Sequence, residues 1–282
     1  MASLLATQSI VHLAVQYGIC SGYIIVSLGI IGNSINLLVF CNVKLFRKNQ
    51  CVFYLIIESI SDLSYQFLLM SSTILISLYG NDLTGYSFIW CKFKYFLIRL
   101  FELITISMIC FQAVDQFSST NCRVFLRQIY IAKLGRILTI IFIGLWSFHS
   151  VFYTYFVTII PSIGCMILNP NWIGYGTYLA YSVVMCLLPI TIASVFSLLA
   201  FRNVRQIVRR QIPIERRRFD RQITAMVLLR VLFYVFLSLP YTVYSFYIAQ
   251  SITTPPDPFK SAVTQLIQAV ISSIANLVFT VS

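Results

Sequence analysis

Long apolar runs alternate with short polar segments along the whole chain. Seven of these runs reach the ~20 residues that a helix needs to cross a hydrocarbon core of ~30 Å. We therefore predict an all-α bundle of seven membrane-spanning helices. The spans are residues 17–41, 52–79, 91–117, 132–159, 176–201, 223–249 and 262–282. Polar residues interrupt the seventh run, so we expect it to face the interior of the bundle.

The charged residues lie mainly between the runs, and basic clusters occur in every second connecting segment. Three, four and eight basic residues lie in or beside the first, third and fifth connecting segments. The other connecting segments hold few charges. Because basic loops stay in the cytosol, we predict an extracellular N-terminus over residues 1–16 and a seven-helix domain over residues 17–282.

Composition supports a chain embedded in the lipid bilayer. Of its 282 residues 59% are hydrophobic and 10% are charged, against roughly 25% charged in a soluble domain. The net charge of +12 could suggest nucleic acid binding, but clustering in alternate loops excludes it. We expect the first span to act as its own signal anchor.

The sequence lacks the local signatures of common enzymes. It contains no Gly-rich phosphate loop, zinc-ligand spacing or nucleophile elbow, so we predict no enzyme and no organic cofactor. The two halves of the chain do not resemble each other, which weakens a secondary-transporter interpretation. A seven-helix transporter or channel-like protein stays as the alternative from another functional class.

Single residues in six of the seven spans, and in one loop, follow a familiar order. They are Gly32-Asn33, Ser61-Asp62-Leu63, Cys91, Asp115-Gln116-Phe117, Trp146, Cys165, Pro189 and Leu239-Pro240. This order and spacing resembles the rhodopsin-like G-protein-coupled receptors. The resemblance implies a plasma-membrane receptor that binds an extracellular peptide or small molecule and activates a heterotrimeric G protein.

Several positions depart from the family pattern. Gln116 stands where the family has an arginine, and Ser238 stands where it usually has tryptophan. Leu277 follows Asn276, so the Asn-Pro-x-x-Tyr motif is missing, and the sequence ends at Ser282. These departures favour either a divergent receptor or a sequence truncated at the end of the seventh helix. A non-signalling receptor fragment is a further alternative. The segment 216–224 looks like that of peptide-receptor branches.

Two cysteines lie outside in the predicted topology. Cys91 opens the third span and Cys165 lies in the loop between the fourth and fifth spans. The outside is oxidising, so we expect them to form a disulfide; two free thiols are the alternative.

Two acidic residues lie within the second span. Glu58 precedes Asp62 by one helical turn, on the same face. Two close carboxylates in a low dielectric cannot both ionise cheaply, so one is expected to bind a proton or a cation. The resemblance implies a sodium and water pocket made by Asp62 with Asn33 and Thr105, and Glu58 is a candidate further member. A hydrogen-bonded network without an ion is the alternative.

The outer half of the third span carries Arg99 and Glu102, where the resemblance places the ligand cavity. At a spacing of three they can pair with each other or contact a ligand. Ile98 falls where aminergic receptors have an acidic residue, which disfavours a simple amine ligand. Tyr241 and Tyr244 on the sixth span could line the cavity, or belong to the aromatic belt at the membrane interface.

The cytosolic half carries the candidate switch residues Asp115, Gln116 and Phe117. Arg230 lies in the same half of the sixth span. We predict that it pairs with Glu58 or Asp115 and supplies the charge that Gln116 lacks; reaching out to lipid headgroups is the alternative. By resemblance, the prolines at positions 189 and 240 are helix hinges, since each removes a backbone hydrogen bond.

Overall fold

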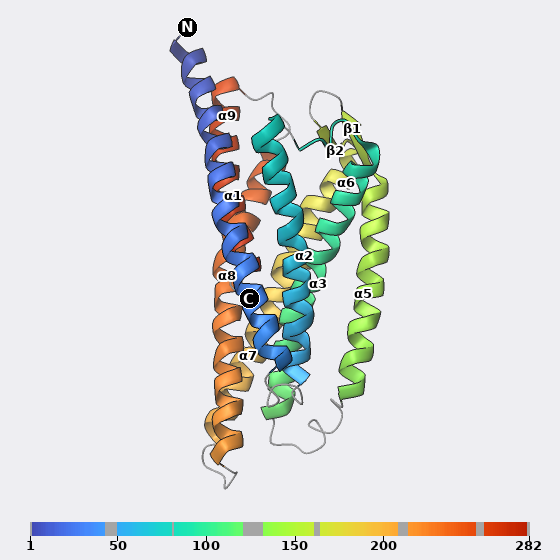
Figure 1. Ribbon diagram of the computed structural model, residues 1–282, viewed down its shortest axis with the longest axis vertical. Helices are drawn as coiled ribbons and strands as arrows, with labels where there is room; N and C mark the ends of the chain where they lie inside the picture. Colours follow the sequence, from blue (N-terminus) through green and yellow to red (C-terminus); the bar gives the residue numbers. More distant parts are fainter. Residues whose placement is uncertain are drawn as a thin grey trace.

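The structure is a computed structural model that describes residues 2–42, 50–80, 82–120, 132–160, 164–207, 214–251 and 257–280. Within these ranges, seven helical segments are long and apolar enough to cross a membrane. They stand side by side in one elongated bundle (Figure 1). The chain is therefore a multi-pass membrane protein by its architecture, and each of the seven predicted spans corresponds to a helix.

The helices and strands have the following bounds. The first four spans are α1 (Ala2–Asn42), α2 (Gln50–Tyr79), α3 (Phe88–Thr120) and α5 (Ala132–Tyr155). Strands β1 (Val157–Ile160) and β2 (Gly164–Ile167) follow. The fifth span consists of α6 (Pro170–Gly174), η1 (Tyr175–Leu187) and α7 (Leu188–Ile207). The last two are α8 (Ile214–Ser251) and α9 (Pro258–Asn276), which ends in the short 3₁₀ turn η2 (Leu277–Phe279).

Two helices begin well before their hydrophobic runs. Helix α1 starts at Ala2, so the segment 1–16 that we separated from the domain is helical from its second residue. Helix α8 starts at Ile214, well before the predicted 223. Glu and Arg are good helix formers, so α8 extends through a polar segment that precedes its apolar run. The start of the apolar run therefore predicts the start of the helix too late.

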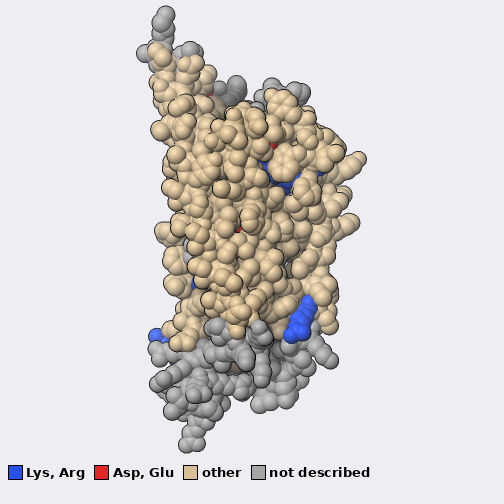
Figure 2. Space-filling model, in the orientation of Figure 1, with Lys and Arg blue, Asp and Glu red and all other residues tan. Residues whose placement is uncertain are grey.

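Helix α3 runs through the centre of the bundle. It packs against α2, α5, α7 and α8, whereas α1 packs against α2 and α9. Helices α1 and α5 lie at opposite edges (Figure 1). An apolar cluster joins α3 to the fifth and sixth spans, and its buried members include Ile109, Ala113, Val227 and Val231. The surface in Figure 2 is almost wholly uncharged along the described helices, as lipid contact requires.

A short hairpin between α5 and α6 was not predicted. Strands β1 and β2 pair antiparallel, with Ile159 opposite Cys165. The β1 sequence Val-Thr-Ile-Ile consists of β-branched residues, which favour strands. The hairpin lies at the same end of the bundle as the first turn of α1 (Figure 1). We call this end the disulfide end.

The fifth span has an unusual backbone. Segment η1 is a π-helix of 13 residues, and π-helical stretches are frequent at functional sites. It ends next to Pro189, which has no N–H to donate to the carbonyl of Met185 four residues earlier. The hydroxyl of Tyr234 on α8 donates to that carbonyl instead. A side chain of the sixth span therefore completes the backbone of the fifth.

Candidate functional site

A cavity of about 260 Å³ lies among the second, third, fifth, sixth and seventh spans. Its wall is largely aromatic and aliphatic, with a few polar groups. The lining residues are Tyr65, Glu102, Ile106, Tyr181, Met185, Cys186, Tyr234, Ser238, Tyr241, Thr242, Ser272, Ala275, Asn276, Val278 and Phe279. Such a concave, mostly apolar site with few polar groups is typical of small-molecule binding.

Arg99 is held beside this cavity in an aromatic cage. Its guanidinium lies 4.1 Å from the ring centre of Tyr181 and 4.8 Å from that of Tyr153, within the range of cation–π attraction. Its Nη1 lies 3.3 Å from Oε2 of Glu102 and 3.1 Å from Sδ of Met185. The two charged residues therefore pair with each other, and it is Glu102 that lines the cavity.

The two tyrosines predicted at the cavity have different positions. Tyr241 lines it, and its ring centre lies 5.9 Å from that of Tyr181. Tyr244 does not: its hydroxyl donates to the backbone carbonyl of Thr264 at 3.0 Å, which ties α8 to α9. Of the pair, only Tyr241 is placed to contact a molecule in the cavity.

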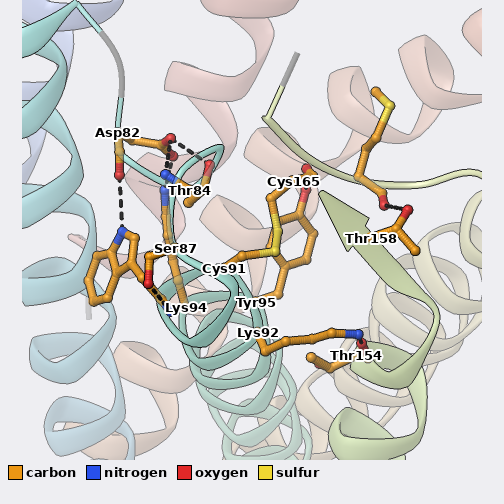
Figure 3. The surroundings of a disulfide bond; sticks show 12 residues. Asp82, Thr84, Ser87, Cys91, Lys92, Lys94, Tyr95, Thr154, Thr158 and Cys165 are labelled. Atoms are coloured by element: carbon orange, nitrogen blue, oxygen red, sulfur yellow. Dashed lines mark hydrogen bonds and ion pairs between the residues drawn. A yellow bond between two sulfur atoms is a disulfide. The ribbon is translucent and has the colours of Figure 1, made fainter. Parts of the chain in front are cut away.

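The disulfide end of α3 is fastened to the hairpin. Cys91 and Cys165 form the predicted disulfide, and the hydroxyl of Tyr95 donates to the carbonyl of Cys165 at 3.0 Å (Figure 3). Lys92 donates to the carbonyls of Thr154 and Tyr155 at 2.7 and 2.9 Å. These are carbonyls of the last turn of α5, which lack partners within their own helix.

Asp82, between α2 and α3, adds a second fastening at this end. Its carboxylate accepts hydrogen bonds from Lys94 at 2.5 Å and from the Thr84 hydroxyl at 2.6 Å (Figure 3). Partial burial alone would raise the pKa of Asp82, but the bonds from Lys94 and Thr84 outweigh it and lower the pKa below its ordinary value. Asp82 is therefore held as the carboxylate.

Deeper in the bundle, Asp62 is fully buried. The hydroxyl of Thr105 donates to its Oδ1 at 2.6 Å, so two of the predicted pocket residues are in direct contact. Asn33 donates Nδ2 to the carbonyls of Gly29 and Phe279, at 3.0 Å each, and joins α1 to η2. No described residue donates a hydrogen bond to its buried Oδ1.

These oxygens suit a sodium ion chemically. Hard cations bind oxygen ligands, and carboxylate and amide oxygens are among the usual ones. The Asp62 carboxylate, with the Thr105 hydroxyl beside it, is the group that would hold the ion, which would neutralise the buried charge. The described residues contain no cluster of three or more His, Cys, Asp or Glu side chains that could hold a metal.

Toward the opposite end, three helices meet at a charged cluster. Arg230 on α8 forms a salt bridge with Glu58 on α2, and Gln112 on α3 donates Nε2 to the same carboxylate. The Glu58 side chain is fully buried and that of Arg230 is 10% exposed. Of the two partners considered for Arg230, the structure places Glu58 against it. We call these three residues the charged cluster.

The switch residues of α3 lie nearer the end of that helix. Oε1 of Gln116 accepts a hydrogen bond from the hydroxyl of Thr224 on α8 at 3.2 Å. The ring of Phe117 lies 5.4 Å from that of Phe196 on α7. Asp115 is buried and forms no ion pair within the described part of the chain. Gln116 thus joins α3 to α8 through a neutral contact.

Sequence reasoning missed several residues of these sites. Tyr153 and Tyr181 form the Arg99 cage, Met185 contacts Arg99, and Gln112 completes the charged cluster. Gln112 had a detectable signal, because a glutamine within an apolar span is costly unless it is partnered. The two tyrosines had none, since tyrosine is common in membrane helices near the interface.

A comparison with protein-family models and with curated proteins finds no match for this chain.

Proposed function

We propose that the chain is a divergent receptor of the rhodopsin-like kind, placed in the plasma membrane with its disulfide end outside. In this proposal an extracellular ligand binds in the cavity, and the opposite end engages a heterotrimeric G protein. The observation that carries it is the charged cluster. It ties α8 to α2 and α3 on the far side of the cavity, where a cytosolic cleft would have to open.

The contacts of α8 support a role in transmission. The same helix lines the cavity through Tyr234, Ser238 and Tyr241 and reaches the charged cluster through Arg230. A ligand that binds one arrangement of α8 better than another would shift the population of the opposite end. Pro240 lies inside α8 between the charged cluster and the disulfide end, where its missing hydrogen bond weakens the helix.

The packing favours a receptor over a channel or transporter. A conducting path would need polar groups along its whole length. Instead, the apolar cluster with Ile109, Ala113, Val227 and Val231 fills the region where α3 faces α8. Among the described residues the charged side chains occur as separate pairs and clusters rather than as one continuous path.

Nucleotide exchange tests the proposal. The purified chain in lipid nanodiscs is mixed with heterotrimeric G proteins of each Gα class, and the uptake of a non-hydrolysable GTP analogue is followed. We expect faster exchange with at least one class. The double variant Glu58→Gln/Arg230→Met should raise basal exchange several-fold, because it releases α8.

Two further variants complete the design. Gln116→Arg restores the charge found in the family and should increase exchange, whereas Ser147→Ala, which removes only a hydroxyl bonded to the Ile143 carbonyl of its own helix, should not. If neither the wild type nor any of these variants accelerates exchange on any class, the receptor proposal is wrong.

A further inference from the structure

The cavity wall carries a carboxylate oxygen that accepts no hydrogen bond from the part of the chain that the structure describes. Arg99 binds Oε2 of Glu102, and no described residue donates a hydrogen bond to Oε1. The Glu102 side chain is 19% exposed and lines the cavity. The hydroxyl of Tyr181, on the same wall, also has no hydrogen-bond partner among the described residues. A ligand that displaces water from these groups loses affinity unless it replaces the hydrogen bonds of that water, so the carboxylate oxygen favours a ligand with a hydrogen-bond donor.

The charge of Arg99 favours a neutral donor over a cationic one. Its guanidinium is fixed between Tyr153 and Tyr181 and already neutralises Glu102. A cationic ligand would place a second positive charge beside Arg99, with one carboxylate shared between them in a low dielectric. A neutral donor meets the free oxygen without that repulsion.

The size and surface of the cavity restrict the rest of the ligand. Its volume of about 260 Å³ lies just below the ~300–1,000 Å³ of drug-sized sites, so it takes a small molecule and not a peptide. Ile106, Val278 and Phe279 supply apolar walls, and Tyr241 adds an aromatic one. An apolar body therefore gains contact over most of its surface.

We infer that the cavity binds a small neutral molecule with an apolar body and one hydrogen-bond donor, such as a phenol, an alcohol or an N–H heterocycle. The donor bonds to Oε1 of Glu102, and Arg99 is the positioning residue that holds this carboxylate. The inference rests on the proposed function in taking the cavity as the ligand site. It names the ligand class that the proposed function leaves open.

Three matched probes test the inference on the purified full-length chain in nanodiscs. 4-Ethylphenol carries a neutral donor, 4-ethylanisole has the same body with the donor methylated, and 4-methylbenzylamine carries a protonated amine. Calorimetric titration gives each dissociation constant. We expect 4-ethylphenol to bind at least about tenfold more tightly than either of the others. The anisole loses a hydrogen bond to a charged group, and the protonated amine is repelled by Arg99.

Two variants separate the donor bond from general affinity. Glu102→Gln keeps a side-chain oxygen for Arg99 but turns its amide N–H₂ toward the cavity, where it cannot accept a hydrogen bond. The dissociation constants of this variant for 4-ethylphenol and 4-ethylanisole should therefore agree within about twofold. Ala275→Phe fills the cavity and should abolish binding of all three. Ser147→Ala, remote from the cavity, should behave as the wild type.

Each other outcome overturns the inference. Equal binding of the phenol and the anisole would show that Glu102 accepts no hydrogen bond from the ligand. Tighter binding of the amine would show a cation site. No binding of 4-ethylphenol would show that the cavity does not bind small neutral hydrogen-bond donors. Basal nucleotide exchange, measured on the same preparation without any probe, reports on the receptor proposal separately.

Discussion

The charged cluster allows a quantitative test of how α2 and α8 are held together. Replacing Arg230 by Met leaves the fully buried Glu58 carboxylate with Gln112 as its remaining donor. Removing one partner of a buried ion pair costs about 3–5 kcal/mol. Arg230 is partly exposed and Gln112 keeps its bond, so we expect the lower end, about 3 kcal/mol. A neutral interhelical hydrogen bond in a membrane averages only about 0.6 kcal/mol.

A double-mutant cycle isolates the pair. Glu58→Gln alone leaves the Arg230 cation without its carboxylate and should cost about 2–3 kcal/mol, less than full burial would because Arg230 is partly exposed. The double variant Glu58→Gln/Arg230→Met removes both charges and their desolvation, so it should be more stable than either single variant. The double change should therefore fall short of the sum of the single changes by about 3 kcal/mol.

Reversible unfolding in mixed micelles, titrated with denaturing detergent, measures these free energies. Arg202→Met, at an exposed position of α7, is the matched control and should change the unfolding free energy by less than about 0.5 kcal/mol. Additive single changes, within about 0.5 kcal/mol, would refute the reasoning that Glu58 and Arg230 stabilise the bundle as a pair.

Three further predictions concern the disulfide end and the buried carboxylate. Cys91→Ser opens a linkage that spans 74 residues of sequence, so it should lower the unfolding free energy by about 2–4 kcal/mol, and reductant should then have no further effect. Because its hydrogen bonds lower the pKa of Asp82 below its ordinary value, Asp82 should stabilise the fold fully above about pH 5 and lose that effect as the pH falls through its folded-state pKa. Thermal unfolding between pH 3 and 6 measures this, and Lys94→Met should flatten the dependence. Sodium chloride, compared with choline chloride, should raise the unfolding temperature of the wild type but not of Asp62→Asn, and Thr105→Val should weaken the response.

The helical architecture could be read from the sequence because seven runs are long enough to span a membrane. The ends of the helices were harder to predict where a helix continues into polar sequence, as α8 does from Ile214. The β1–β2 hairpin was missed although its β-branched residues are a signal. The hairpin begins within the last residues of the apolar run 132–159, whose length predicts a membrane-spanning helix.

The candidate sites could be predicted only in part from the sequence. Residues close in sequence, such as Arg99 and Glu102, can be paired from helical spacing alone. Contacts between helices depend on rotation and depth, which hydropathy does not determine. For this reason the choice between Glu58 and Asp115 as partner of Arg230 needed the structure, and so did the different positions of Tyr241 and Tyr244. The π-helical η1, whose carbonyl at Met185 is satisfied by Tyr234, has no sequence pattern that predicts it.

The most direct test of the central claim measures whether α8 moves away from α3 when a G protein binds. Spin labels at Ser118 on α3 and Gln222 on α8 report that distance by pulsed resonance. The background replaces the exposed Cys20 and Cys41, and also Cys122, which follows Ser118 by four residues in the sequence. A pair at Leu38 and Ile60, on the exposed faces of α1 and α2, serves as the control. The receptor account predicts a longer distance for the first pair, and no change for the control, when nucleotide-free heterotrimer is added. An unchanged distance between Ser118 and Gln222 in its presence would contradict it.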